Sequence, residues 1–339
     1  MTQAQTHRIF FGLVLAAWLV GCRPEPVPFN VEDIRTLPSH FPAYVEPENN
    51  PMNEAKWELG RRLFFDQRLG SDGQLSCASC HRPELAFSDN QPTSLGTHGV
   101  QGTRNTPALM NLAWQPRFHR EGGIPSLEAQ ILAPLQEPTE FNQNLEDLVT
   151  MLSLDENYQA LAQEGFERDF DAFVLTRSIA AFERTLISGA SAYDRWLEGD
   201  SSALSVLEIQ GLQVFESLEC GSCHQGFWLT DFDNHNNGLY ADYPDPGAFR
   251  LTLDSADIGA FKTPTLRNVG ITAPYMFDGS LQTLDEVVDH YASGGSGHPN
   301  QDLRIQPFEI TDEEKAQLIA FLNSMTDHEF VDWAVGLRP

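Results

Sequence analysis

Two Cys-x-x-Cys-His segments carry the most specific chemistry in this chain of 339 residues. In this pattern two thiols bond covalently to a porphyrin, and the adjoining histidine is placed to ligate the iron. A structural zinc site or a redox dithiol would also use paired cysteines, but zinc would not require a histidine directly after each second cysteine. The sequence therefore predicts two covalently bound c-type haems. The attachment residues are Cys77, Cys80 and His81 in the first segment and Cys220, Cys223 and His224 in the second.

The fifth cysteine, Cys22, follows a short apolar stretch near the N-terminus. Ile9 to Val20 is too short for a transmembrane helix, and Leu19-Val20-Gly21-Cys22 is similar to a bacterial lipobox. This predicts a lipoprotein-type signal peptide over residues 1–21 and a lipid anchor at Cys22. The chain would then lie in the periplasm or at the cell surface, anchored to the outer membrane. An ordinary signal peptide followed by an incidental cysteine is the alternative, and it too exports the chain.

The charge of the chain restricts its partners. The formal net charge is −27, which argues against nucleic acid and against anionic lipid surfaces. Membrane contact is therefore expected only through the lipid anchor. An acidic surface favours basic proteins or cations, or it serves only to keep the protein soluble.

The chain contains an internal duplication. Trp57-Glu-Leu-Gly-Arg-Arg-Leu-Phe-Phe65 precedes the first haem motif, and Leu207-Glu-Ile-Gln-Gly-Leu-Gln-Val-Phe215 precedes the second. Downstream, Arg104-Asn-Thr-Pro-Ala-Leu-Met-Asn111 is echoed by Lys262-Thr-Pro-Thr-Leu-Arg-Asn268. This indicates two related domains, over residues 52–200 and 201–339, preceded by a Pro-, Asn- and Glu-rich tether over residues 22–51.

The expected fold is mostly α, with two cytochrome-c-like domains, one haem in each, and long irregular loops. Apolar residues at helical spacing predict a helix within Phe170–Ser188. Thr311-Asp-Glu-Glu314 resembles a capping box that opens a helix running to about Asn323. Between His224 and Thr263 the density of Asp, Asn, Gly and Pro predicts an irregular loop.

Together the paired haem motifs, the RNTPxLxN echo and the segment Ser126–Glu140 resemble the bacterial dihaem cytochrome c peroxidase/MauG superfamily, over about residues 52 to 326. The resemblance implies that the N-terminal haem reacts with peroxide and that the C-terminal haem is a six-coordinate electron relay. His81 and His224 match the two proximal iron ligands.

The resemblance also supplies a peroxide pocket. The family pattern Leu-x-x-Gln-x-x-x-Pro-x-x-x-Pro-x-Glu is matched by Leu127, Gln130, Pro134, Pro138 and Glu140. Glu140 falls on the acid/base glutamate and Gln130 on the pocket glutamine. Cleavage of the O–O bond needs one group that takes a proton from one oxygen and returns it to the other. Glu128 is the rival for this role.

The sixth ligand of the second haem separates the subclasses of the superfamily. The family register places Tyr291 on this position, as in MauG-like enzymes, and Met276 is the competitor, as in peroxidases that draw electrons from a cytochrome. A phenolate favours ferric and higher oxidation states, whereas a thioether favours ferrous iron. His98 falls in the loop that caps the first haem in classical peroxidases; the alternative is an exposed loop residue.

Two further comparisons with the family concern the region between the haems. The side chain of Asn105 and the carbonyls of Thr272 and Pro274 match the family's calcium position, which predicts a bound Ca²⁺. The family usually places a Trp between the haems, but Arg120 stands there in this chain. Electron transfer would then use another residue, such as Trp114, or direct tunnelling. The His-Arg-Glu-Gly-Gly variant is most similar to the MbnH-like branch.

The resemblance thus implies a dihaem c-type oxidoreductase that uses hydrogen peroxide to form high-valent haem iron and oxidises a Trp or Tyr of a partner protein. The MbnH-like branch implies an MbnP-like, copper-associated partner. One alternative is a classical peroxidase that reduces peroxide with electrons from a small cytochrome or cupredoxin. Another is a non-catalytic dihaem electron-transfer protein, which would need both irons coordinatively saturated.

Overall fold

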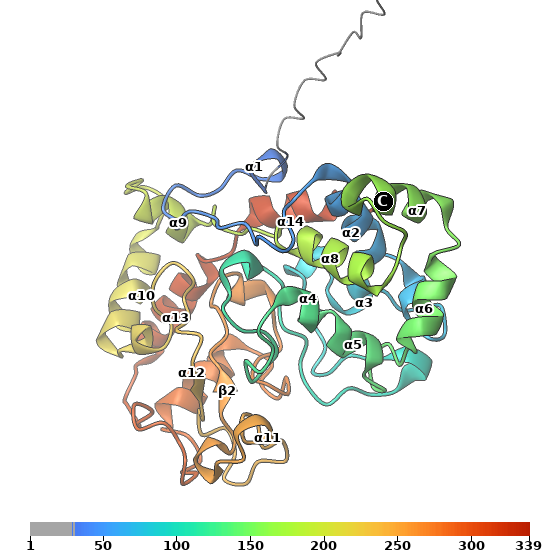
Figure 1. Ribbon diagram of the computed structural model, residues 1–339. Helices are drawn as coiled ribbons and strands as arrows, with labels where there is room; N and C mark the ends of the chain where they lie inside the picture. The colour runs from blue at the N-terminus through green and yellow to red at the C-terminus, as the bar shows by residue number, and fades with distance from the viewer. Residues whose placement is uncertain (1–28, 30) are drawn as a thin grey trace, which may run out of the picture.

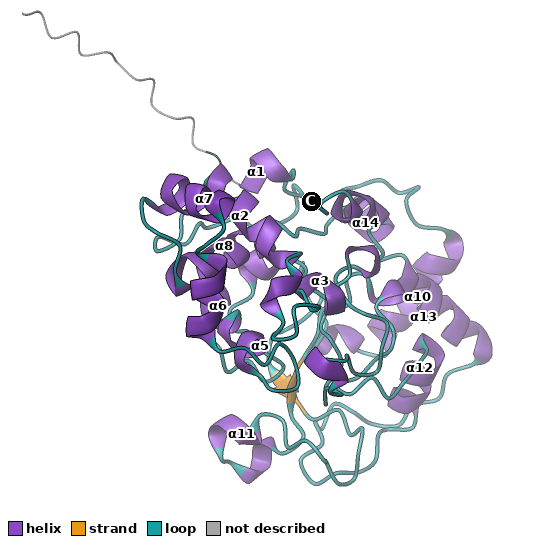
Figure 2. Ribbon diagram, turned by 90° about the vertical axis from the view of Figure 1, so that its right-hand side faces the viewer, coloured by secondary structure: helices purple, strands orange, loops and turns teal. Residues whose placement is uncertain are grey.

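The computed structural model describes residue 29 and residues 31–339. The signal peptide and the lipid anchor at Cys22 predicted from the sequence lie outside the described residues. The fold is mostly helical, as predicted, and its helices gather in two groups, with loops of the chain between them (Figures 1 and 2). None of the helices in the described part has the length and apolar character needed to cross a membrane.

The secondary structure consists of short helices and one minimal sheet. Strands β1 (Asn234–His235) and β2 (Phe261–Lys262) pair antiparallel. The α-helices are α1 (Val31–Ile34), α2 (Glu54–Phe64), α3 (Cys77–Cys80), α4 (Leu127–Gln130), α5 (Leu132–Gln136), α6 (Leu145–Leu152), α7 (Glu156–Phe166), α8 (Ala172–Glu183), α9 (Ala192–Leu197), α10 (Val206–Ser217), α11 (Phe249–Thr252), α12 (Leu284–Ala292), α13 (Asp312–Asn323) and α14 (His328–Val335).

Local capping explains where the predicted helices begin. At the start of α13 the Thr311 hydroxyl accepts from the Glu314 amide, and the Glu314 carboxylate accepts from the Thr311 amide. The capping box and the end of this helix at Asn323 are therefore confirmed. The helix predicted within residues 170–188 is α8, which begins after Asp171 because its carboxylate accepts from the Val174 amide. The loop predicted between residues 224 and 263 is irregular apart from β1, β2, α11 and a short 3₁₀ turn.

The duplicated segments form the same helix crossing in each half. In the first half α2 packs against α8, and in the second half α10 packs against α13. Each crossing places a glycine against the partner backbone: an added Cβ would lie 1.8 Å from the Ser178 carbonyl oxygen at Gly60 and 1.9 Å from the Gln317 carbonyl oxygen at Gly211. Since no side chain fits at these distances, only glycine permits the approach.

The second pair of duplicated segments, Arg104–Asn111 and Lys262–Asn268, also has the same local structure in both halves. Asn111 and Asn268 both adopt left-handed backbone conformations, with φ of 55° and 57°. Each opens a short 3₁₀ turn, Leu112–Trp114 in the first half and Val269–Ile271 in the second. Asn is among the few residues that tolerate this conformation at low cost, which explains why it stands at both positions.

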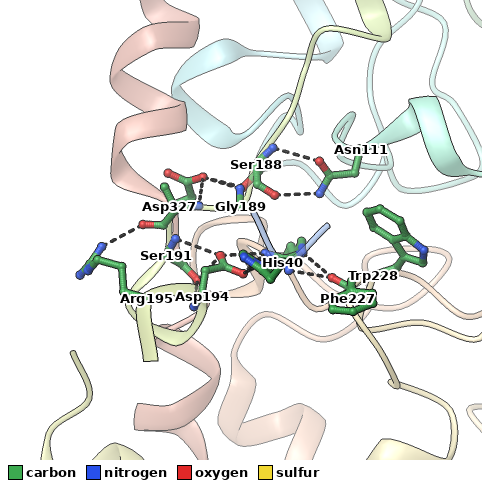
Figure 3. Close-up of polar contacts among 12 residues, drawn as sticks. His40, Asn111, Ser188, Gly189, Ser191, Asp194, Arg195, Phe227, Trp228 and Asp327 are labelled. Atoms are coloured by element: carbon green, nitrogen blue, oxygen red, sulfur yellow. Dashed lines mark hydrogen bonds and ion pairs between the residues drawn. The ribbon is translucent and has the colours of Figure 1, made fainter. Parts of the chain in front are cut away.

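Both asparagines bind Ser188 at the connection between the halves, where Figure 3 labels Asn111, Ser188 and Asp327. The Asn111 side chain exchanges two hydrogen bonds with the Ser188 backbone, at 2.9 and 3.0 Å. Asn268 donates to the Ser188 hydroxyl at 2.8 Å and accepts from the Asp327 amide at 2.8 Å. The buried Asp327 carboxylate in turn accepts from the Gly189 amide at 2.8 Å. This fully buried network fixes the linker to both halves.

Both ends of the described chain depart from the predicted division into domains. Val31 and Phe41 are buried against Ala181 and Ile187, so the described part of the segment expected as a tether packs on the folded body. At the other end, Phe330 of α14 is buried in the core of the first half. The boundaries themselves remain predictions, because the segments at the chain ends and the linker pack across them.

Replacing Gly211 by alanine tests the helix crossing. We expect Gly211→Ala to lower the free energy of unfolding of the haem-loaded protein by about 1–3 kcal/mol, because α10 and α13 must separate. Gln213→Ala, on the exposed side of α10, is the control and should change it by less than about 0.5 kcal/mol. The measurement is denaturant unfolding, and equal stability of the two variants would contradict this account of the packing.

Candidate functional site

One cavity of 1330 Å³ spans both halves of the molecule. The cysteines and histidines of both Cys-x-x-Cys-His motifs lie in its wall. None of the cysteines in the described part of the chain forms a disulfide, so all four thiols are free to form thioether bonds. The wall is mostly apolar, with polar groups at a few positions, as expected for a macrocycle-binding site.

The two motif histidines are oriented in the same way. His81 Nδ1 lies 2.9 Å from the Phe87 carbonyl oxygen, and His224 Nδ1 lies 3.2 Å from the Leu229 carbonyl oxygen. Because a carbonyl only accepts, Nδ1 carries the proton in each ring and Nε2 keeps its lone pair. Burial lowers the pKa of both histidines, so both are neutral near pH 7. A neutral imidazole with a fixed Nδ1–H is the form that ligates iron, and these residues fit two haems.

The predicted peroxide pocket lies in the wall beside the first motif. Glu140, Gln130 and Pro134 all line the cavity. The loop at Thr97 holds Glu140 in place, since the Thr97 amide donates to the Glu140 carbonyl at 2.8 Å. Glu140 is exposed to the cavity, and desolvation by the surrounding wall, followed by the negative charge of Glu137, raises the pKa of its carboxyl above the ordinary value. The Gln130 amide oxygen is buried without a hydrogen-bond partner, so it can accept from a small ligand.

Glu128 has a different environment from Glu140. Its carboxylate lies 2.7 Å from Arg184 and accepts from Asn50 at 2.9 Å. Although burial opposes ionisation, Arg184 and Asn50 hold the pKa of Glu128 below its usual value. Glu128 is not part of the cavity wall. A carboxylate fixed in an ion pair cannot shuttle protons easily, and the geometry therefore favours Glu140 over its rival.

Both candidates for the sixth ligand of the second haem face the cavity. Burial raises the pKa of Tyr291, and its contact with Asn237 opposes this rise. The Asn237 side chain also donates to the Met276 sulfur at 3.2 Å. The two side chains thus share one neighbour, and the assignment of Tyr291 stays a prediction.

His98 lies away from the cavity. It is exposed in the 3₁₀ turn Thr97–Gly99, and its backbone amide donates to Asp72 at 2.9 Å. It is not among the residues that line the cavity. The geometry agrees with the alternative of an exposed loop residue.

The residues predicted to hold calcium do not fit that role. Thr272 and Pro274 line the cavity. However, the backbone oxygen and the side-chain oxygen of Asn105 both accept from Nη2 of Arg120. A guanidinium thus already occupies the oxygen pair, and Ca²⁺ needs six to eight oxygen ligands.

Sequence reasoning missed two groups in the cavity wall. Glu183, at the end of α8, is buried, and burial raises the pKa of its carboxyl to about 8. Trp228 stacks on Trp114 with ring centroids 5.0 Å apart and an interplanar angle of 29°. No local pattern marks either residue, although the position of Trp228 four residues after His224 was a usable signal.

Comparisons with known proteins show the family of this chain. The family model for di-haem cytochrome c peroxidase matches residues 54–202. The methylamine utilization protein MauG of Methylorubrum extorquens is 37% identical over 301 residues, covering 87% of this chain and 85% of that protein. The cytochrome c551 peroxidase of Nitrosomonas europaea is 33% identical over 288 residues, covering 83% of this chain and 82% of that protein.

A solved structure gives the same result for the fold. A MauG-like protein associated with microbial copper homeostasis superposes with a TM-score of 0.82 and 34% identity, covering 87% of this chain and 96% of that one. The fold and site define a dihaem c-type oxidoreductase. This chain belongs to the dihaem cytochrome c peroxidase/MauG family, whose members carry two haems.

Ligand substitution would decide between Tyr291 and Met276. We expect Tyr291→Phe to change the low-spin EPR signal of the second haem and to raise its midpoint potential, because an anionic ligand to ferric iron is lost. Met276→Leu, the matched change at the neighbouring side chain, should preserve the signal. The opposite pattern, with loss of a sulfur-to-iron charge-transfer band in Met276→Leu, would assign the methionine.

Proposed function

We propose that this protein uses hydrogen peroxide to oxidise a Trp or Tyr side chain of a partner protein. The observation that carries the proposal is the placement of Glu140 and Gln130 in the cavity wall beside the first haem motif, with Tyr291 in the wall beside the second. The similarity to MauG supports it at the level of the family. When bound, the two haems supply the iron that reacts with peroxide and holds the oxidising equivalents.

The protein's own contribution in the first half is proton transfer. The Glu140 carboxylate takes a proton from one peroxide oxygen and returns it to the other, which leaves as water. The orphaned Gln130 oxygen accepts from the peroxide O–H and orients it. Pro134 and Gly96 line the same part of the wall, next to Glu140 and Gln130.

Where the two halves meet, an aromatic cluster supplies a route for electrons. Trp228 lines the cavity and stacks on Trp114, and Phe41 packs edge-on against both rings at 5.0 and 5.7 Å. Phe227, next in sequence to Trp228 (Figure 3), is 44% exposed. Trp228 therefore lies in the cavity wall while the adjoining Phe227 lies at the surface. A partner protein that docks there gives up an electron to the Trp228–Trp114 pair without entering the cavity.

The partner and the location are inferred from the chain's charge and its relatives. A net charge of −27 suits a basic partner surface. The structural relative associated with copper homeostasis favours a copper-associated, MbnP-like substrate protein. Export through the N-terminal segment, with a lipid anchor at Cys22, would place both proteins in the periplasm or at the cell surface.

One observation keeps the conventional peroxidase as a second candidate function. Met276 faces the same part of the cavity as Tyr291, and Asn237 contacts both. Methionine ligation would favour a reducible second haem and electron supply from a small cytochrome or cupredoxin.

The first test adds one equivalent of peroxide to the as-isolated diferric protein. We expect loss of both ferric EPR signals without prior reduction. The rate should fall as pH drops through the raised pKa of Glu140, because only the carboxylate accepts the proton. Glu140→Gln should slow the reaction roughly 100-fold or more and remove this pH limb.

Glu137→Gln is the matched control for that test. It removes the neighbouring negative charge that raises the pKa of Glu140. The pH at which the reaction with peroxide slows should therefore be lower, while the rate at high pH stays the same. A requirement for prior reduction in the wild-type protein would instead support the conventional peroxidase.

Trp228→Phe tests the aromatic route. We expect the first reaction with peroxide to keep its rate, while oxidation of partner or donor side chains slows at least tenfold, because phenylalanine is much harder to oxidise than tryptophan. Trp196→Phe is the control, since Trp196 stacks on Tyr193 at 6.1 Å and does not line the cavity. Stopped-flow spectroscopy and peptide mass spectrometry measure the two steps. Equal slowing in both variants would exclude Trp228 as the route.

A further inference from the structure

Asn105 occupies a junction between the two halves of the molecule. Its backbone amide donates to the Phe277 carbonyl at 2.8 Å, and its side-chain amide donates to the Gln91 carbonyl at 2.9 Å. These contacts leave its two oxygens directed elsewhere. Nη2 of Arg120 donates to both, with the side-chain oxygen at 3.1 Å and the backbone oxygen closer. One guanidinium nitrogen therefore satisfies the oxygen pair that would otherwise face a metal ion.

Arg120 also joins the halves through its backbone. Its carbonyl accepts from the Lys262 amide of β2 at 2.8 Å. The next residue, Glu121, accepts from the Asn234 side chain through its carbonyl at 3.0 Å and pairs with Arg104. The loop that carries Arg120 is thus held to the second half on both sides. The guanidinium itself contacts Asn105, whose backbone amide binds the Phe277 carbonyl of the second half, so the cation acts on the junction through Asn105.

The local charge disfavours a second cation. Arg104 is neutralised by Glu121 and Asp245, at 2.5 and 2.6 Å. No carboxylate in the described part of the chain lies within ion-pair distance of Arg120 or Lys262. Burial, followed by the charges of Arg120 and Arg117, lowers the pKa of Lys262 to about 7. A divalent ion would add charge where positive charge already exceeds negative charge.

Among the described residues, acidic and other metal-binding side chains do not gather at this junction either. In the part of the chain that the structure describes, the one group of His, Cys, Asp and Glu close enough to share an ion is Cys223, Asp231 and His235. Cys223 belongs to a haem motif, and the two His235 nitrogens lie 2.8 Å from Asp231 and Asp302. That group therefore carries no separate metal site.

The free donors of this cluster point to an anion. Arg120 Nε is buried with no hydrogen-bond partner, and so is Arg104 Nη1. Both residues and Lys262 line the cavity that holds the haem motifs. Each haem brings two carboxylates, which are the anions that such donors require.

We propose that the Arg120 guanidinium is the fixed cation between the two halves, in place of a metal ion, and that with Lys262 it neutralises haem carboxylates. The role is one of positioning: Arg120 orders Asn105 and the junction and sets the electrostatic potential at the haems. The proposal needs only the two haems of the family and is independent of the partner protein.

Metal analysis of the haem-loaded protein is the first test. We expect well under one calcium per chain, and no change in the visible spectrum or the unfolding midpoint on treatment with EGTA. One tightly held calcium per chain, whose removal alters the haem spectrum, would overturn the proposal.

Substitutions at Arg120 form the second test. Arg120→Ala should lower the midpoint of thermal unfolding by about 5 °C and shift the haem midpoint potentials to lower values, because a buried positive charge that favours electron uptake is lost. Millimolar guanidinium, but not Ca²⁺, should restore both. Arg120→Lys keeps the charge, so it should retain the potentials while losing part of the stability.

Arg117→Ala is the matched control, because Arg117 lies three residues earlier in the same loop with its side chain about half exposed. It should leave both measurements unchanged. Identical behaviour of Arg120→Ala and Arg117→Ala would reject the role of Arg120. Because none of these measurements uses peroxide, their result is separate from that of the proposed function.

Discussion

The rest of the structure depends on the hydrogen bond between each motif histidine and a backbone carbonyl. The acceptors are Phe87 and Leu229, and both hold left-handed backbone conformations, with φ of 61° and 51°. This conformation costs a bulky residue about 1 kcal/mol or more, so the surrounding structure must enforce it. The hydrogen bond fixes the tautomer of each ring and leaves Nε2 available inside the cavity. The glycine crossings and the Asn111–Ser188–Asn268 network hold the two loops where this geometry is possible.

The duplicated frame has different chemistry in its two halves. Beside His81 the cavity wall offers Glu140 and Gln130, and the amide oxygen of Gln130 is buried without a hydrogen-bond partner. Beside His224 it offers Tyr291 and Met276, which can fill a coordination position. One half is therefore suited to admit a small substrate and the other to exchange electrons. This division is compatible with catalysis at one haem and long-range oxidation through the other.

The charged side chains that line the cavity differ from the acidic character of the whole chain. The protein is strongly acidic, yet six of its 21 lysines and arginines line the haem cavity: Arg104, Arg120, Arg250, Lys262, Arg267 and Arg304. Arg250 and Arg304 are exposed, but the other four are buried or partly buried, and burial makes an uncompensated cation costly, so these four need anions inside the fold. Arg104 and Arg267 find carboxylates of the protein, at Asp245 and Asp194. Arg120 and Lys262 do not, and this contrast makes the junction between the halves the most informative electrostatic feature of the molecule.

The sequence by itself determined the covalent chemistry and the class of fold, because both are encoded locally. Cysteine spacing defines haem attachment within five residues, capping residues define where helices begin, and the repeated Asn and Gly positions indicate the duplication. Tertiary structure alone decided the rest. Glu128 and Glu140 are the same residue type twelve positions apart, and only the tertiary packing binds the first to Arg184 and Asn50 while the second lines the cavity. Likewise, Asn105 suggested calcium until the fold brought Arg120 onto its oxygens. The physical reason is that a side chain's charge state and free hydrogen-bonding capacity depend on neighbours that lie far away in sequence, and no local pattern specifies them.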